Sequence, residues 1–357
     1  MKILAIETSC DETAISVVEA SGSLTAPRFN ILAHQVSSQV ALHAPFGGVV
    51  PNIAKREHLK NLPIVLDQAL TEAGLTEEEA IKSVEAIAVT VGPGLEPALW
   101  TGIEFAKKLA LEWDKPLIPT NHLEGHVLSP LLNEQKIVTP AVALVASGGH
   151  TELVLVKNLG EYEKIGQTKD DAAGEAFDKV ARLLGLPYPG GPNLSKLAAT
   201  ITSQDTWRLP RPMLNSPDYH FSFSGLKTAV LYAKKNYESE HGRELNEQEK
   251  SELAFEFENA VVEVLVKKTL KAVRDFNAQT VVVGGGVIAN TRLRESLARE
   301  LELNYPDVIL LLPPTELSTD NATMIAMAGY LRYLKNEFIT PDKISFAPLV
   351  ANGNLNF

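Results

Sequence analysis

Short runs of apolar and β-branched residues alternate along the chain with longer stretches of helical periodicity. The short runs predict strands at residues 2–8, 14–20, 84–91, 116–120, 141–146, 151–157, 280–286 and 308–313. The periodic stretches predict helices at residues 51–73, 97–113, 121–132, 173–185, 194–200, 247–276, 290–302 and 319–335. This alternation is typical of the α/β class, with sheets that helices largely cover. Residues 203–222 carry several prolines and little periodicity, so we expect an ordered loop there.

One segment occurs twice in similar form. AIETSCDETAISVV (5–18) and ALVASGGHTELVLV (143–156) align at an offset of 138, which places Ser9 on Ser147 and Thr13 on Thr151. Each copy predicts a strand, a small polar turn and a second strand, and such a turn can present backbone N–H groups to a phosphate. The repeat indicates either a duplicated domain with a phosphate-binding turn in each half, or two ordinary hairpins.

The length and composition are those of a globular protein, and the chain is long enough for two domains, each with its own hydrophobic core. The chain has 357 residues, of which 45% are hydrophobic and 22% charged. No apolar run approaches the ~18 residues of a membrane helix, and Glu7, Asp11 and Glu12 interrupt any secretory signal. The single cysteine, Cys10, excludes an internal disulfide. We therefore expect a cytoplasmic protein.

The net charge of −11 argues against a broad nucleic-acid-binding surface, because binding to phosphates depends on Lys and Arg. If the protein binds RNA, we expect the contact to come from a local basic patch or from partner subunits.

Two histidines stand four residues apart in the helical segment NHLEGH (121–126). His122 and His126 therefore leave the same helix face, which suits a divalent transition metal or a structural role. The zincin protease motif requires Glu directly after the first His, where this chain has Leu123, so a metalloprotease would lack its general base. Spacing identifies no third ligand. Asp320, in STDNA at a predicted helix start, is one of many candidates and also a candidate N-cap.

Two glycine-rich segments follow predicted strands. SGGHT (147–151) either lets a ligand approach the backbone or forms a plain tight turn. GGGVIAN (284–290) opens a helix whose N-terminus can face a ligand, and Asn290 either contacts an adenosine or caps that helix. The segment lacks the third glycine of the dinucleotide fingerprint, and the chain contains no P-loop motif.

Acidic residues gather in DDAAGEAFDK (170–179), at the start of a predicted helix. They can cap the helix or bind a hydroxyl or amine of a substrate. PGGP (189–192) predicts a rigid turn with free backbone groups.

These motifs, in this order, resemble those of one family. IETSCDET, GPG at 92–94, NHLEGH, SGGHT, DDAAGEAFDK, PGGP, FSFSGLKT, GGGVIAN and STDNA are similar to motifs of the bacterial tRNA N6-adenosine threonylcarbamoyltransferases, formerly described as O-sialoglycoprotein endopeptidases. The resemblance runs from about residue 3 to residue 335. It implies the actin-like ATPase fold of actin, Hsp70 and sugar kinases, with two duplicated lobes around a cleft. These lobes would be residues 1–134 and 135–357, with the final helix packing back on the first lobe.

The resemblance also implies site residues. One divalent metal ion per chain, Fe²⁺ or Zn²⁺, is expected on His122, His126 and Asp320. The implied substrate-binding residues are Val145, Ala146, Ser147, Gly148 and Gly149 for the phosphate, and Asp178, Gly191 and Asn290 for the nucleoside. Glu12 matches a family glutamate near the phosphates, and Ser195 stands where some relatives have Asp. The motifs supply no general base, so the catalytic residue is not assigned.

The implied reaction transfers the threonylcarbamoyl group from L-threonylcarbamoyl adenylate to N6 of the adenosine next to the anticodon in ANN-decoding tRNAs, and releases AMP. The exocyclic amine is a poor nucleophile, so positioning and charge stabilisation are expected to dominate. The resemblance also implies two partners besides tRNA: a paralogous actin-like subunit and a small P-loop ATPase subunit.

Three other functions are compatible with parts of the sequence. A kinase or chaperone-like ATPase on the same fold would need carboxylates for Mg²⁺ and has no use for the paired histidines. A metalloprotease would use the histidines but lacks the glutamate. A non-catalytic scaffold subunit has no need of an intact His122, His126 and Asp320 set.

Overall fold

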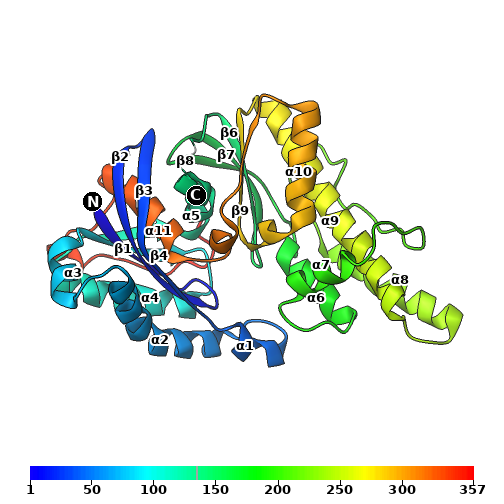
Figure 1. The fold of residues 1–357 in the computed structure, drawn as a ribbon, viewed down its shortest axis with the longest axis horizontal. Coiled ribbons are helices and arrows are strands. Elements are labelled where there is room, and N and C mark those ends of the chain that lie inside the picture. The colour runs from blue at the N-terminus through cyan, green and yellow to red at the C-terminus, as the bar shows by residue number, and fades with distance from the viewer. Residues whose placement is uncertain (134–135) are drawn as a thin grey trace. The chain divides into compact units, whose positions relative to one another are not determined.

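The computed structural model describes residues 1–133 and 136–357, which form two compact units (Figure 1). The first unit holds Met1–Ile137, Lys157–Tyr162 and Leu312–Phe357, and the second holds Val138–Val156 and Glu163–Leu311. The expected boundary between residues 134 and 135 lies outside the described residues. Among the described residues, no helix combines the length and the apolar character needed to cross a membrane.

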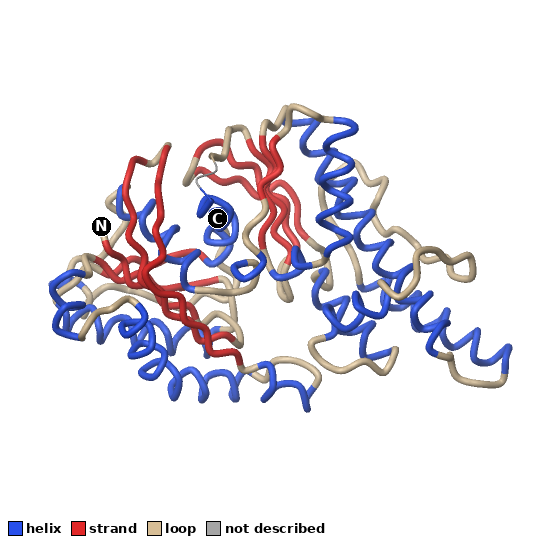
Figure 2. Tube along the Cα trace, in the orientation of Figure 1, coloured by secondary structure: helices blue, strands red, loops and turns tan. Residues whose placement is uncertain are grey.

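The first unit is built on a five-stranded sheet (Figure 2). Its strands are β1 (Lys2–Glu7), β2 (Glu12–Ser23), β3 (Ala26–Ser38), β4 (Ala86–Gly92) and β5 (Leu117–Asn121), in the order β3-β2-β1-β4-β5. The pairs β1–β2 and β2–β3 are antiparallel, whereas β1–β4 and β4–β5 are parallel. The carboxyl ends of β1, β4 and β5 therefore meet at one edge of the sheet.

Helices cover both faces of this sheet, as the near-continuous apolar runs of its central strands β1 and β4 require. The helices of the first unit are α1 (Val40–His43), η1 (Ala44–Phe46), α2 (Pro51–Glu72), α3 (Glu77–Ser83), α4 (Glu96–Trp113), α5 (His122–Leu128), η2 (Ser129–Asn133), η4 (Thr315–Leu317), α11 (Ala322–Leu334) and η5 (Pro341–Lys343). Leu4 of β1 shares an apolar cluster with Leu62 of α2. Its neighbour Ile3 shares a second cluster with Met327 of α11.

Helix α11 approaches the sheet closely because it carries a glycine at the contact. A Cβ atom added to Gly329 would lie 2.7 Å from the Cβ of Ala88 in β4, closer than real Cβ contacts. The final helix of the chain is thus part of the first unit, although more than 180 residues separate it from β5.

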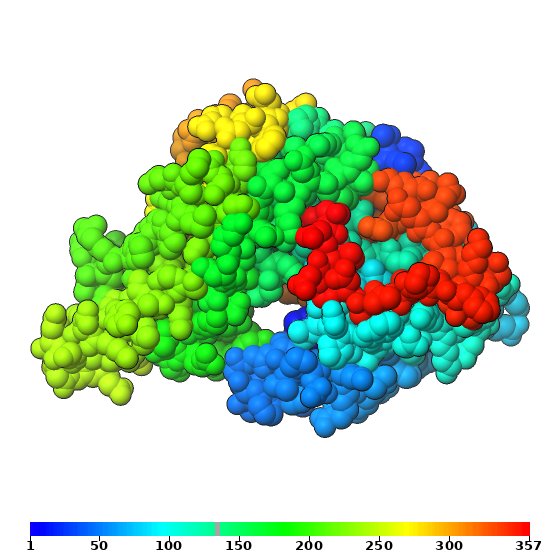
Figure 3. Space-filling model, turned by 180° about the vertical axis from the view of Figure 1, so that it is seen from behind, coloured from blue at the N-terminus to red at the C-terminus, as the bar shows by residue number. Residues whose placement is uncertain are grey.

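The segment after α11 runs across the surface of the first unit (red in Figure 3). The Asn352 N–H donates to the carbonyl of Val91, and the Gly94 N–H donates to the carbonyl of Gly353. The side chain of Asn121, the last residue of β5, donates to the carbonyl of Asn356 at 3.0 Å. These bonds attach the segment to the ends of β4 and β5.

The second unit repeats the strand order of the first. Its strands are β6 (Ala141–Ala146), β7 (Thr151–Asn158), β8 (Glu161–Gln167), β9 (Thr280–Gly284) and β10 (Ile309–Leu311), in the order β8-β7-β6-β9-β10. β6 is antiparallel to β7 and parallel to β9, as β1 is to β2 and β4. The repeated segments 5–18 and 143–156 occupy equivalent hairpins, so the duplication expected from the sequence is confirmed.

The helices of the second unit lie between β8 and β9 and between β9 and β10 in the chain. They are α6 (Ala173–Leu183), α7 (Gly190–Ala198), α8 (Ser224–His241), α9 (Glu247–Phe276), η3 (Gly286–Ala289) and α10 (Thr291–Asn304). Asn246 and Glu249 form a capping box at the start of the 30-residue α9. Asp170, from the acidic motif, accepts hydrogen bonds from the backbone N–H groups of Phe223 and Ser224 at the start of α8. One residue of that motif therefore has a capping role.

Every predicted strand and helix is present, but β3, β8, α3, α8 and several helices of at most four residues were not predicted. The edge strand β3 was missed because its residues alternate between partly and fully exposed, so it lacks an apolar run. β8 and α8 are similarly polar, and α3 is short. Helix α7 begins at Gly190 rather than at residue 194, because Gly190, Gly191 and Pro192 lie in its first turn, where backbone N–H groups need no helical partner.

We expect Gly329→Ala to lower the free energy of unfolding by about 1–3 kcal/mol, because the added methyl group meets Ala88 in a packed core. Chemical denaturation of the purified protein measures this. In the double variant with Ala88→Gly, the two costs should be less than additive, since the second change removes the atom that clashes. Additive costs would show that this contact does not limit the approach of α11.

Candidate functional site

Polar side chains of the first unit gather at the carboxyl ends of its parallel strands. Glu7 is the last residue of β1, Thr90 lies near the end of β4, and His122 directly follows β5. The three side chains are fully or almost fully buried. The sheet therefore brings together residues that lie far apart in the sequence.

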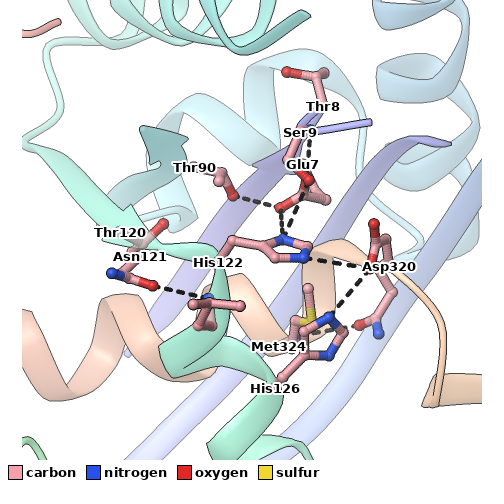
Figure 4. A network of polar contacts seen from close by, with 12 residues as sticks. Glu7, Thr8, Ser9, Thr90, Thr120, Asn121, His122, His126, Asp320 and Met324 are labelled. Atoms are coloured by element: carbon pink, nitrogen blue, oxygen red, sulfur yellow. Dashed lines mark hydrogen bonds and ion pairs between the residues drawn. The ribbon is translucent and has the colours of Figure 1, made fainter. Parts of the chain in front are cut away.

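The two histidines of NHLEGH lie on one face of α5, as their spacing predicts (Figure 4). Their ring centroids are 4.6 Å apart. The side chain of Asn121 caps the helix by accepting hydrogen bonds from the N–H groups of Leu123 and Glu124. Glu124 faces away from the histidines and pairs with Arg332 of α11 at 2.8 Å, so it is not available as the base of a protease.

Asp320 completes a group with the two histidines. Its Oδ1 lies 3.4 Å from Nε2 of His122 and 3.2 Å from Nε2 of His126. The N-cap of α11 is the next residue, Asn321, whose side chain accepts a hydrogen bond from the N–H of Met324. Capping therefore does not occupy Asp320, and its carboxylate faces the imidazoles.

The chemistry of this group fits a divalent metal ion. One nitrogen of each histidine and one oxygen of Asp320 all lie within 4.8 Å of one another. Two imidazoles and one carboxylate are a common ligand set for Zn²⁺ and Fe²⁺. Nε2 of His126 contacts Asp320, and its Nδ1 is buried without a hydrogen-bond partner among the described residues.

The electrostatics of the group also favour a cation. Burial works against a charge on His122, yet the carboxylates of Asp320 and Glu7 raise its pKa well above the ordinary value. Burial likewise opposes the charge on Asp320, but His122 and His126 hold its pKa well below the usual range. Burial lowers the pKa of His126. A position between two carboxylates that stabilises a proton can stabilise a metal cation for the same reason.

Glu7 is a residue of this site that sequence reasoning missed. Its Oε2 lies 3.2 Å from Nδ1 of His122, on the side of the ring opposite to Asp320. The Ser9 N–H and the Thr90 hydroxyl also donate to Glu7. The position of Glu7 at the end of a predicted buried strand was the signal that could have identified it.

Glu12, a candidate substrate-binding residue, lies in the first unit at the start of β2. Burial raises its pKa well above the ordinary value, and the nearby carboxylates of Asp320 and Asp11 act in the same direction. Burial and Asp11 also raise the pKa of Cys10, which is therefore not a ready thiolate. The acidic turn thus belongs to the surroundings of the histidine group.

The second unit contains a cavity of about 1150 Å³. Five of the candidate substrate-binding residues line it: Gly148, Asp178, Gly191, Ser195 and Asn290. Val145 and Ala146 are instead buried in β6, and Ser147 and Gly149 do not line the cavity. The cavity therefore brings the three candidate nucleoside-binding residues together with Gly148, one of the candidate phosphate-binding residues.

Residues 147–150 form a tight turn with open glycines. The Ser147 hydroxyl accepts a hydrogen bond from the His150 N–H at 3.1 Å. Apart from their chain neighbours, no described residue has a heavy atom within 4 Å of a Cβ built on Gly148 or Gly149. Gly285, with a φ of 91°, packs so closely on Ala146 that a Cβ would meet its carbonyl oxygen. The strand before the turn is thereby held against the glycine segment that follows β9.

Asp178 and Asn290 shape the wall of the cavity through internal bonds. Asp178 accepts hydrogen bonds from the N–H groups of Gly190 and Gly191, at 2.7 and 3.3 Å. Asn290 caps α10 through its oxygen, and its Nδ2 donates to Ser195 and Glu258. Asn290 is therefore the N-cap of α10 and also a residue of the cavity wall.

Glu258 and Arg292 were not singled out from the sequence, yet both line this cavity. Buried Glu258 binds Arg292 at 2.8 Å, and the guanidinium lies 4.3 Å from the ring centroid of Phe255. No motif marks Glu258, which stands in the middle of the long helix α9. Only the crossing of α9 with α10 shows that it contributes to the site.

Comparison with known proteins adds a family to this geometry. The family model described as TsaD, tRNA N6-adenosine threonylcarbamoyltransferase, matches residues 30–327. A protein of that name from Thermosipho africanus is 48% identical over 335 residues, covering 94% of this chain and 95% of the relative. Another from Chromobacterium violaceum is 48% identical over 332 residues, covering 93% of each chain.

Solved structures resemble the chain at low sequence identity. The activator of the 2-hydroxyisocaproyl-CoA dehydratase from Clostridium difficile, with bound ADPNP, aligns with a TM-score of 0.50 at 14% identity, over 94% of this chain and 96% of that chain. Full-length HypF, in its phosphate- and nucleotide-bound form, aligns with a TM-score of 0.58 at 14% identity, over 94% of this chain and 55% of that chain.

The duplicated sheets and these structural neighbours define the class, which is the actin-like ATPase fold. Within that class, the chain belongs to the tRNA N6-adenosine threonylcarbamoyltransferase family. It is a transferase that modifies tRNA. The kinase, protease and scaffold alternatives are not favoured.

We expect Glu258→Gln to lower the free energy of unfolding by about 2 kcal/mol, because it leaves Arg292 facing an amide at a buried position. The matched control is Glu263→Gln on the same helix, where the more exposed carboxylate pairs with Arg211 and Lys267. That change should cost about 0–1 kcal/mol. Equal costs, measured by chemical denaturation, would contradict a structural role for the buried pair.

Proposed function

We propose that the chain transfers the threonylcarbamoyl group from L-threonylcarbamoyl adenylate to N6 of the adenosine next to the anticodon in ANN-decoding tRNAs. The amine nitrogen attacks the carbamoyl carbon and a C–N bond forms. The bond from that carbon to the phosphate oxygen breaks, AMP leaves with the electron pair, and the amine loses a proton. The observation that carries the proposal is the convergence of His122, His126 and Asp320 in a chain of this family.

The metal-binding group is His122, His126 and Asp320, with one Fe²⁺ or Zn²⁺ per chain. When bound, such an ion supplies a Lewis acid for phosphate or carbamoyl oxygens. Both imidazoles present Nε2 to the carboxylate oxygen of Asp320, and all three side chains are held by the ends of α5 and α11. The protein's contribution is to hold these ligands in place before the ion arrives.

The cavity of the second unit is proposed to bind the adenylate. Its size exceeds that of a nucleoside monophosphate, and its lining includes Gly148, Asp178, Gly191 and Asn290. The two structural neighbours each hold a bound nucleotide, which supports this use of the fold. We assign the phosphate to the run from Val145 to Gly149, where open glycines leave backbone groups accessible. Ser195 and Glu12 are further candidates for substrate contacts.

We further propose that the chain acts in the cytoplasm with partner subunits, a paralogous actin-like protein and a small P-loop ATPase. The net charge of −11 supports the need for them, since a tRNA requires a basic surface. The substrate L-threonylcarbamoyl adenylate is a mixed anhydride, and another enzyme has to make it before the transfer.

We expect His126→Ala and Asp320→Ala each to reduce metal affinity and tRNA modification by about 100-fold or more. Each variant removes a metal ligand itself, and removing even a residue that only supports a ligand costs about 10–100-fold. Elemental analysis of the purified protein and mass spectrometry of tRNA nucleosides measure the two effects. His241→Ala, which removes an exposed histidine of α8, serves as the control and should change neither. Retention of both metal and activity in the two variants would refute the proposed centre.

We expect Asn290→Ala to weaken binding of AMP by ~10-fold while the metal content stays the same, because the wall of the cavity loses its bonds to Ser195 and Glu258. Isothermal titration calorimetry with AMP measures this. The control is Asn304→Ala at the exposed end of α10. Unchanged AMP binding in Asn290→Ala would mean that the adenylate binds elsewhere.

A further inference from the structure

The two imidazoles of the candidate metal centre differ in how they are held. Nδ1 of His122 lies 3.2 Å from Oε2 of Glu7 and 3.2 Å from the Ser9 hydroxyl. Nδ1 of His126 has no hydrogen-bond partner among the described residues. Asp320 contacts Nε2 of both rings, but only the His122 ring has a hydrogen-bond partner among the described residues on its Nδ1 side (Figure 4).

Glu7 receives donors on both of its oxygens. Oε1 accepts a hydrogen bond from the Ser9 N–H, and Oε2 accepts one from the Thr90 hydroxyl in addition to its contact with His122. The side chain is fully buried. A carboxylate only accepts hydrogen bonds when ionised, so the contact requires that Nδ1 of His122 carries the hydrogen. The opposite nitrogen, Nε2, then faces Asp320.

We propose that Glu7 is a positioning residue of this site, which sets the tautomer and orientation of His122 so that Nε2 presents its lone pair to the metal ion. The inference rests on the proposed metal-binding function of His122, His126 and Asp320. Carboxylates that accept a hydrogen bond from a metal-bound histidine orient the ring and increase its basicity. The strands β1 and β4 supply Glu7 and Thr90, so the sheet itself provides the support for this ligand.

An amide cannot replace this carboxylate. The three groups around Glu7 all donate, whereas glutamine has one accepting oxygen and one donating NH₂ group. In Glu7→Gln, the NH₂ group must face either the Ser9 N–H, or the Thr90 hydroxyl and Nδ1 of His122. The first arrangement buries two opposed donors. The second favours the tautomer of His122 that has its hydrogen on Nε2, which blocks the metal ligand.

The test is the affinity of the purified protein for Co²⁺, measured by competition with a chelator, together with the absorption spectrum of the Co²⁺-loaded protein. We expect Glu7→Gln to lower the affinity by about 10–100-fold and to alter the ligand-field bands. The matched control is Glu124→Gln, which removes a buried carboxylate from the metal-binding helix itself. Glu124 faces Arg332 rather than the histidines, so the Co²⁺ affinity of this variant should stay within about twofold of that of the unchanged protein.

A double-mutant cycle separates positioning from general damage. In the His122→Ala background, Glu7→Gln should have no further effect on Co²⁺ affinity, because the ring that it orients is gone. An equal loss in both backgrounds would contradict the inference and indicate a structural effect. Thermal unfolding of the metal-free variants verifies that each one folds.

The outcomes distinguish this inference from the function on which it rests. If His126→Ala and Asp320→Ala bind Co²⁺ as tightly as the unchanged protein, the metal centre itself is wrong. If those two lose Co²⁺ while Glu7→Gln binds it normally, the centre is correct and only the role of Glu7 is wrong.

Discussion

The contact of Asp320 with the two histidines depends on how closely α11 packs against α5. Gly125 lies between the histidines, and a Cβ at this position would be 2.9 Å from Cγ of Met324. A larger residue at position 125 would push α11 outward and carry Asp320 with it. The glycine of NHLEGH is thus as necessary to the geometry as the ligands that flank it.

The parallel strands determine where this contact lies. Because β1, β4 and β5 end at one edge, Glu7, Thr90 and His122 meet there without any local sequence relation. Burial makes charges expensive at such a place, and the site compensates by alternating acidic and basic groups. The order Glu7, His122, Asp320 sets an imidazole between two carboxylates. A divalent cation bound at these groups would likewise be stabilised by the neighbouring carboxylates.

In the second unit, most motif residues are engaged with other parts of the protein. Asp178 holds the PGGP turn, Asn290 caps α10, and Asp170 holds the start of α8. Asp178 and Asn290 thereby shape the wall of the cavity. This explains why motifs so polar in sequence coincide with short turns and helix starts, where backbone N–H groups need partners.

The sequence by itself determined the α/β class, most helices and strands, and the pair of histidines, because periodicity and spacing are local properties of the chain. It also indicated Asp320, but only through resemblance, since 194 residues separate it from His126. The tertiary structure alone decided that Glu7 stands behind His122 and that Glu258 supports the cavity wall. Those contacts join separate strands and helices, and a one-dimensional pattern does not encode which ends of a sheet meet.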